Sequence, residues 1–161
     1  MQRNLVLIRL PVLALGATIV MLGPAAAQTP SVRYSNPATM AKPAGYTHVF
    51  EVNGPGRTIY IAGQLGYDRA GKQGADFREQ ATLVYGNLKA AIESAGGKME
   101  NIVKLNAFLT DIRAQLPIYR EVRDKFVNVA APPASTTLEV PKLAREGALL
   151  EVEAIAVLPA R

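Results

Sequence analysis

The chain of 161 residues contains no cysteine. A protein without cysteine has no disulfide, no thiolate zinc site and no cysteine nucleophile. Its histidine content is also minimal, because His48 is the only one. A single histidine argues against a site with several histidine ligands, and we expect no metal. Any chemistry must therefore use carboxylates, hydroxyls, backbone groups and water.

The first 27 residues are typical of an export signal. Arg3 and Arg9 give a short basic start, an apolar stretch runs over 10–22, and Ala25-Ala26-Ala27 supplies the small residues that a signal peptidase reads. The apolar stretch is shorter than the roughly 20 residues that a membrane span needs. A retained membrane anchor is the alternative interpretation. We expect cleavage after Ala27, no membrane association afterwards and a periplasmic or secreted location.

Cleavage would leave 161 − 27 = 134 residues, which is the size of one ordinary domain. It would also remove two of the 18 basic side chains, so that 16 would face 13 acidic ones and the net charge would fall from +5 to +3. The basic side chains form no run and do not alternate with aromatic residues. The composition therefore gives no indication of a nucleic-acid partner.

The segment 28–45 has no apolar period and predicts an extended arm before the folded domain, 46–161. Residues 48–52 alternate in polarity, Asn53-Gly54-Pro55-Gly56 is a strong turn sequence, and 58–62 has β-type composition. This pattern predicts a β-hairpin. A helix follows, capped by Asp76 with Glu79 in a capping box and stopped at Gly96-Gly97. Apolar residues share one of its faces: Ala81, Val84, Leu88, Ala91 and Ala95.

The second half of the chain predicts a strand, a helix and two further strands. Residues 102–109 form the strand, with Val103, Leu105, Ala107 and Leu109 on one face. Asp111 begins the second helix, which has Pro117 in its first turn and ends before Pro132-Pro133. The last two strands span 135–140 and 149–158.

The predicted order β-β-α-β-α-β-β is typical of an α+β fold in which both helices cover one face of the sheet. The strand residues Ile59, Ile61, Leu138 and Val152 are too apolar to leave both sheet faces in water. Self-association is the simplest way to cover the second face.

Several motifs follow one another along the chain. They are Gly45-Tyr46-Thr47-His48, Ile59-Tyr60-Ile61-Ala62-Gly63-Gln64, Val84-Tyr85-Gly86-Asn87-Leu88, Pro133-Ala134-Ser135-Thr136-Thr137-Leu138-Glu139-Val140 and Leu150-Glu151-Val152-Glu153-Ala154-Ile155-Ala156. In this order and spacing the chain from Tyr46 to Leu158 resembles the Rid (reactive-intermediate deaminase) family. The resemblance implies a chorismate-mutase-like fold and a homotrimer with a central barrel. It also implies clefts between subunits in which imines or enamines such as 2-aminoacrylate are hydrolysed to a 2-keto acid and ammonia, without a cofactor.

The resemblance also implies roles for individual residues. Glu151 stands at the position of the glutamate that orients the attacking water, and is the catalytic candidate. Tyr46 matches an aromatic wall of the cleft, and Gly63 matches a glycine whose backbone approaches the ligand. Thr137 replaces a cysteine that some members carry. From the pattern alone, Glu151 and Glu153 read equally well as solvated strand-edge residues, Tyr46 as a half-buried strand tyrosine and Gly63 as a turn glycine.

Ser135 departs from the family, whose deaminases have arginine at this position to hold the substrate carboxylate. A guanidinium grips a carboxylate through two charge-assisted hydrogen bonds, whereas a serine hydroxyl offers one neutral bond. Charged hydrogen bonds contribute roughly 1.5–3 kcal/mol and neutral ones about 1 kcal/mol. Arg145 or Arg57 would have to restore the charge, although a solvated arginine is the default for both.

Three functions stay open at this point. The first is weak or redirected hydrolysis of an imine or enamine, which the retained Glu151 favours. The second is a non-catalytic trimer that binds a small metabolite, and the third is a chaperone-like surface protein. A ribonuclease is the least favoured, because the chain has no histidine pair and no basic groove is visible in the sequence.

Overall fold

The computed structural model describes residues 29–161, so the predicted signal segment lies outside the described residues. The described chain forms, in order, β1 (Ser31–Ser35), β2 (Val49–Asn53), β3 (Gly56–Leu65), α1 (Phe77–Ser94), the short 3-10 helix η1 (Met99–Asn101), β4 (Ile102–Leu109), α2 (Ile112–Arg123), β5 (Ala134–Glu139) and β6 (Leu150–Pro159).

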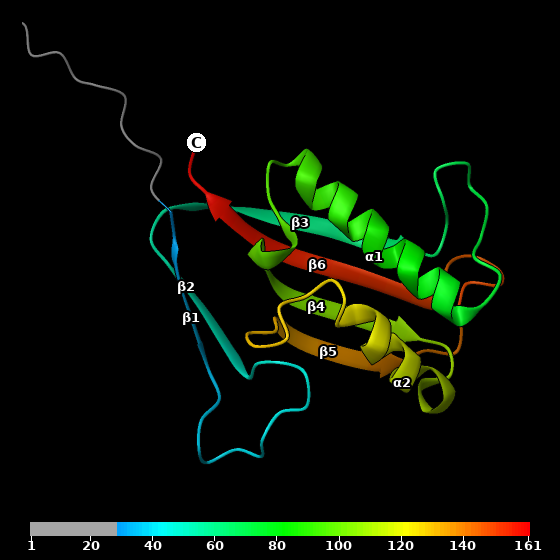
Figure 1. Ribbon diagram of the computed structural model, residues 1–161, viewed down its shortest axis with the longest axis horizontal. Helices are drawn as coiled ribbons and strands as arrows, with labels where there is room; N and C mark the ends of the chain where they lie inside the picture. The colour runs from blue at the N-terminus through cyan, green and yellow to red at the C-terminus, as the bar shows by residue number, and fades with distance from the viewer. Residues whose placement is uncertain (1–28) are drawn as a thin grey trace, which may run out of the picture.

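The main sheet has four strands in the order β3-β6-β4-β5. β6 runs antiparallel to both β3 and β4, whereas β5 runs parallel to β4 at the sheet edge. Both helices lie on the same face of this sheet, with α1 against β3 and β6 and α2 against β4 (Figure 1). The predicted α+β layer with two helices on one face is therefore confirmed.

The hydrophobic core lies between the helices and the sheet, and β6 shows how the sequence builds it. Every second residue of β6 is buried, because successive side chains of a strand point to opposite faces: Leu150, Val152, Ala154, Ala156 and Leu158. The helices contribute mainly Val84, Tyr85, Leu88, Ile92, Tyr119 and Val122. In β4 an irregular register between Ile102 and Lys104 places Ile102 in the core, and the predicted core residue Val103 is only partly buried.

The ends of α1 follow the sequence signals. The Asp76 carboxylate accepts a hydrogen bond from the Glu79 backbone N–H at 2.8 Å, while the Glu79 carboxylate accepts one from the N–H of Ala75. In the predicted capping box the Glu79 carboxylate would accept from the N–H of Asp76, so the observed bond to Ala75 lies one residue earlier in the chain. At the other end Gly96 has φ +82°, a left-handed conformation that glycine adopts without strain. The N–H of Gly97 bonds back to the carbonyl of Ile92, which closes the helix.

The predicted hairpin of β2 with β3 is wrong. β2 pairs antiparallel with β1, from Ser31 opposite Asn53 to Ser35 opposite Val49, and β3 pairs with β6 instead. The chain does turn at Gly54, but β6 offers β3 a longer apolar partner than β2 does. Part of the segment predicted as an extended arm is therefore a strand with a defined partner, and the two-stranded ribbon projects from the main sheet (Figure 1).

The second helix also differs from its prediction in two details. Pro117 lies at the sixth position of α2 and not in its first turn. The helix ends at Arg123, well before Pro132, through a tight turn in which the N–H groups of Phe126 and Val127 bond to the Arg123 carbonyl. Asp111 caps the start as predicted, since its carboxylate accepts from the Ala114 N–H at 3.0 Å.

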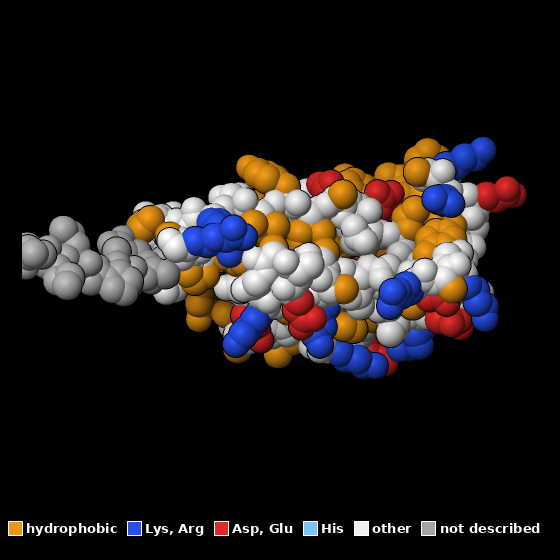
Figure 2. Space-filling view, turned by 90° about the horizontal axis from the view of Figure 1, so that it is seen from above, with side chains coloured by type: hydrophobic (Ala, Val, Ile, Leu, Met, Phe, Trp, Pro, Cys, Tyr) orange, Lys and Arg blue, Asp and Glu red, His pale blue; other side chains and the backbone are white. Residues whose placement is uncertain are grey.

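The sheet face opposite the helices carries exposed apolar side chains among polar ones. Tyr60 is 78% exposed and Leu138 is 49% exposed. Ile61 and Val152, by contrast, are buried in the core under the helices. Charged side chains of both signs and apolar side chains are interspersed when the molecule is viewed from the edge formed by α1 and β3 (Figure 2). The predicted homotrimer would cover the open face, and it stays a prediction.

None of the helices within residues 29–161 combines the length and the apolar character that crossing a bilayer requires.

Two buried tyrosines join the helices. Tyr85 of α1 donates a hydrogen bond through its hydroxyl to the Tyr119 hydroxyl of α2 at 2.9 Å, and both side chains are fully buried. Burial raises the pKa of both phenols above the usual value. Each hydroxyl thus depends on the other for a partner in a dry environment.

We predict that Tyr85→Phe lowers the free energy of unfolding by about 1–2 kcal/mol, because it leaves the Tyr119 hydroxyl buried without its donor. Removing both hydroxyls in Tyr85→Phe/Tyr119→Phe should cost less than the sum of the two single changes. Urea unfolding of the four proteins measures this coupling. Strictly additive losses would show that the hydrogen bond contributes nothing to the packing of α1 against α2.

Candidate functional site

The five residues predicted for the site form two separate groups. Gly63 and Glu151 make up the first group, on β3 and β6. The pairing of β3 with β6 is irregular between Ile61 and Gln64, which brings the Gly63 backbone against the Glu151 side chain. A Cβ at Gly63 would overlap Oε1 of Glu151 and lie 2.7 Å from its Cδ. A larger residue at this point would therefore displace the Glu151 side chain.

Glu151 differs from Glu153, its neighbour on the same face of β6. Glu153 accepts a hydrogen bond from the Asn106 amide at 2.8 Å and lines a cavity of about 490 Å³ on the open face. Within residues 29–161, the Glu151 carboxylate has no hydrogen-bond or ion-pair partner, and its side chain is half-buried. A carboxylate with this freedom is able to orient a water molecule and accept its proton.

The second group surrounds a cavity of about 320 Å³ beneath α2. Tyr46, Ser135 and Thr137 line it, together with Ala44, Ile112, Leu116, Arg120 and Arg123. Ser135 and Thr137 come from the edge strand β5, and alternate residues of a strand point to the same face. Tyr46, Ser135 and Thr137 therefore lie together within one chain, whereas Glu151 lies apart from them, and their predicted roles stay predictions.

Strand pairing separates the two groups. Ser135 lies opposite Leu105 and Thr137 opposite Ala107, and both of these β4 residues are buried on the helix side of the sheet. Glu151 lies opposite Phe108, whose side chain points to the other face. One chain therefore presents the carboxylate and the Ser135 cavity on opposite faces of its sheet.

The Ser135 hydroxyl is exceptional in its surroundings. Its Oγ is shielded from solvent and has no hydrogen-bond partner, the only side-chain atom of this kind within the described part of the chain. A buried hydroxyl without a partner costs free energy, and native structures rarely keep one without a reason. A ligand would have to turn or reach this hydroxyl in order to bond with it, and Ser135 is one of the residues that line the cavity.

Two arginines of α2 were missed by the sequence analysis. Arg120 and Arg123 are three residues apart, so they share one face of the helix, and both line the Ser135 cavity. The apolar stripe of the sequence around them predicts a helix, but it does not show which strand that helix covers. Only the packing of α2 beside β5 brings them to Ser135.

Arg123 is held firmly in place. It is 5% exposed, and its Nε and Nη2 donate to Oδ1 of Asp124 at 2.9 and 2.7 Å. Its guanidinium also lies 5.9 Å from the centroid of the Tyr119 ring. Gly45 has φ +78° and passes so close that a Cβ there would collide with Nη2 of Arg123. Arg120, by contrast, is exposed and forms no side-chain hydrogen bond or ion pair within residues 29–161.

The two arginines that the sequence analysis weighed as replacements lie elsewhere. Arg57 donates to the carbonyls of Pro159 at 3.3 Å and Ala95 at 3.2 Å, at the C-terminal end of α1. Arg145 places its guanidinium 5.6 Å from the centroid of the Tyr67 ring, in the loop before β6. Neither lines the Ser135 cavity of its own chain.

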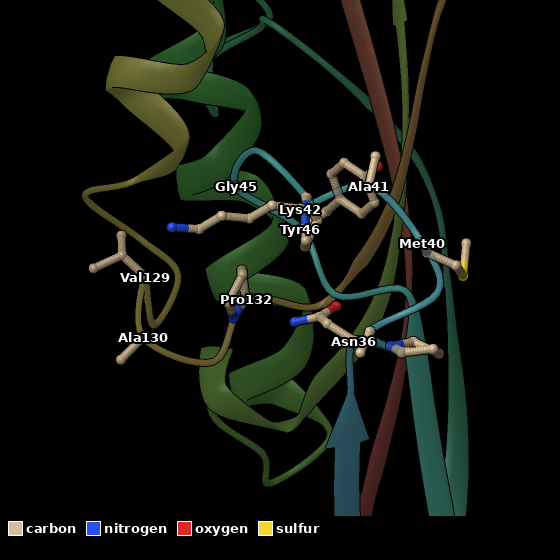
Figure 3. Close-up of a pocket in the computed structure, with 12 residues that line it drawn as sticks. Asn36, Met40, Ala41, Lys42, Gly45, Tyr46, Val129, Ala130 and Pro132 are labelled. Atoms are coloured by element: carbon tan, nitrogen blue, oxygen red, sulfur yellow. The ribbon is translucent and has the colours of Figure 1, made fainter.

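Tyr46 stands between this cavity and a neighbouring one. The second cavity, of about 460 Å³, lies between the loop 36–46 and the segment 129–132 (Figure 3). Lys42 extends across it toward Val129 (Figure 3). The Tyr46 ring packs edge-on against His48, with ring centroids 5.2 Å apart, and Nε2 of His48 lies 2.9 Å from the Ala41 carbonyl oxygen. His48 thus supports the loop and lines neither cavity.

Residues 29–161 contain no group of three or more histidine or carboxylate side chains that could hold a metal ion. The Ser135 cavity is lined by hydroxyls, guanidinium groups and apolar side chains, which suit a small organic ligand.

Comparison with known proteins identifies the family of the chain. The family model described as endoribonuclease L-PSP matches residues 37–158. A RutC family protein of Aquifex aeolicus is 37% identical over 70% of this chain and 87% of its own length. A 2-iminobutanoate/2-iminopropanoate deaminase of Dermatophagoides farinae is 32% identical over 64% of this chain and 80% of its own length.

Among solved structures, the Rid-family protein YyfB of Yersinia pestis, whose function is unknown, is 30% identical and has a TM-score of 0.71. It covers 79% of this chain and 98% of its own. The family match spans the sheet, both helices and every residue of the two groups. On these grounds the chain belongs to the Rid family, whose members the endoribonuclease L-PSP model describes.

Proposed function

We propose that the protein binds a small metabolite in clefts between subunits and hydrolyses an imine or enamine there, with substrate choice altered by Ser135. The relative named as a 2-iminobutanoate/2-iminopropanoate deaminase supports the reaction class. The retained Glu151, half-buried and without a partner among the described residues, supports hydrolysis over binding alone.

The observation that carries the proposal is the division of the site between the two faces of one sheet. The group of Gly63 and Glu151 contains a candidate catalytic carboxylate but no positively charged side chain to hold a ligand. The Ser135 cavity contains guanidinium groups and hydroxyls but no carboxylate to activate water. A second subunit packed with its open face near the β5 edge of the first would bring the two halves together. The exposed Tyr60 and Leu138 on that open face favour such packing.

The reaction follows from the chemistry of Glu151. Its carboxylate orients a water molecule and accepts a proton as the water oxygen bonds to the carbon of the protonated imine. The adduct carries a hydroxyl and an amino group on one carbon. Glu151 returns its proton to the nitrogen, ammonia leaves, and the hydroxyl gives up its proton as the C–O bond becomes the carbonyl of the product. An enamine enters the same sequence once it has taken a proton on carbon and become an imine.

Ser135 sets the limit on this activity. The resemblance implies an arginine at this position in the deaminases of the family, where it grips the substrate carboxylate with two charged hydrogen bonds. The serine hydroxyl is one neutral donor, which is worth less by roughly 1 kcal/mol or more. Hydrolysis of 2-aminoacrylate is therefore expected to be weak, or the preferred imine to be a different one.

We predict that Glu151→Gln reduces imine hydrolysis by about 10²-fold or more, because it removes the group that takes the proton from water. The measurement generates 2-aminoacrylate in situ with a lyase and follows its decay with added protein. Glu153→Gln is the matched control, since it removes a carboxylate from the same face of β6 whose partner is Asn106.

Two results would contradict this prediction. Equal loss in both variants would mean that the general charge of the face matters and not Glu151 itself. A wild-type protein that binds a 2-keto acid but never accelerates imine decay would leave a non-catalytic binding trimer as the function. Suppression of protein aggregation that persists in Glu151→Ala would support a chaperone-like role instead.

A subunit-mixing experiment tests the shared cleft. Glu151→Gln removes one half of the site and Ser135→Trp fills the cavity of the other half, so each variant alone should be inactive. If each cleft takes one half from each of two neighbours, trimers reassembled from equal amounts should regain roughly a quarter of the wild-type activity. Light scattering should show the mass of three chains, and a mixture that stays inactive would rule out the shared cleft.

A further inference from the structure

We infer that Arg120 of α2 supplies the positive charge that Ser135 lacks, and that the Ser135 cavity binds a small carboxylic acid through both residues. This inference rests on the proposed function, because it names the substrate class of the same site. The sequence alone predicted that the carboxylate anchor is lost at Ser135. In this inference the substrate keeps its carboxylate, and the anchor comes from helix α2 and not from strand β5.

The charge of the cavity is the first argument. Its lining contains two guanidinium groups and three hydroxyls, from Tyr46, Ser135 and Thr137, and no carboxylate. Every polar side chain of the lining is able to donate a hydrogen bond, and the remaining residues are apolar. A cavity of this composition attracts an anion and offers little to a cation.

The two arginines differ in whether a carboxylate already balances their charge. The charge of Arg123 is balanced by Asp124, which takes hydrogen bonds from both Nε and Nη2. Arg123 therefore acts as a fixed wall that positions the loop at Gly45. Arg120 has no partner among the described residues, so its planar fork is free to meet a carboxylate with two parallel hydrogen bonds.

The unpaired Ser135 hydroxyl is the second, independent argument. Its Oγ is shielded from solvent and lacks a partner within the described chain, and other atoms of Ser135 line the cavity. A ligand oxygen placed between Arg120 and Ser135 would satisfy this hydroxyl. Ile112 and Leu116 form an apolar wall beside it, which suits the short hydrocarbon part of a small acid.

The test measures binding and needs no turnover. The full chain is titrated with 2-oxobutanoate, the product expected from 2-iminobutanoate, and with butan-2-one, which has the same ketone and no carboxylate. Chemical shifts in NMR spectra report both affinities. We expect the wild type to bind 2-oxobutanoate more tightly than butan-2-one. Arg120→Gln should lower the affinity for 2-oxobutanoate by about tenfold and leave the affinity for butan-2-one unchanged.

Three further variants make the result specific. Arg113→Gln removes the same charge from the same helix at a residue outside the cavity lining, and should leave both affinities unchanged. Arg120→Lys should restore part of the affinity, since the charge returns without the fork. Ser135→Arg in the Arg120→Gln background should restore most of it, because it puts a guanidinium back into the same cavity.

Each outcome decides one question. The inference is overturned if Arg120→Gln binds 2-oxobutanoate as tightly as Arg113→Gln does, or if the wild type shows no preference for the acid. Either result combined with normal imine hydrolysis would leave the proposed function intact. Retained preference for the acid without any hydrolysis would sink the proposed reaction and keep the anion site.

Discussion

The alternation of side chains along β5 and β6 is the constraint on which the site depends. Successive residues of a strand point to opposite faces, so burying Leu150 and Val152 under the helices sends Glu151 to the open face. Parallel pairing of β5 with β4 sends Ser135 and Thr137 to the helix side, in step with Leu105 and Ala107. A shift of one residue in either strand would exchange the two faces and take apart the core together with the site. Core packing and chemistry are thus set by the same register.

Much of the fold was predictable because its signals are local. The cap at Asp76, the apolar face of α1 and the stop at Gly96 are encoded within 21 residues, and the structure follows them. Alternation likewise identified β4, β5 and β6 to within a residue or so. Strand pairing was less accessible, because it depends on competition between segments far apart in the chain. β3 pairs with β6 across about ninety residues, and β2 is left to pair with β1, which carries no recognisable pattern of its own.

The candidate site divides in the same way. Glu151, Gly63, Ser135, Thr137 and Tyr46 were identified from motifs, because a motif fixes which residues stand at given positions along a strand. The motifs contain no information on how α2 lies over the edge of the sheet, and Arg120 and Arg123 were therefore not predicted as site residues. Their spacing of three residues shows that they share a helix face, but the orientation of that face follows from Tyr119 and Val122 entering the core. Arg57 and Arg145, chosen for their places in loops and strands, have other partners.

The serine at position 135 can be interpreted in two ways, and the tertiary structure is needed to choose between them. Considered on β5 alone, it is the loss of a charge, and it predicts a disabled carboxylate site. Considered together with α2, it leaves an unpaired hydroxyl on a residue that lines a cavity whose lining carries two guanidinium groups and no acid. An arginine on β5 would have shared this cavity with Arg120, because Asp124 balances the charge of Arg123, and the two like charges would repel each other unless an anion were present. A serine relieves that repulsion in the empty site. If the anchoring charge lies on the helix, as we infer for Arg120, the empty cavity carries less repulsion and keeps an attraction for acids.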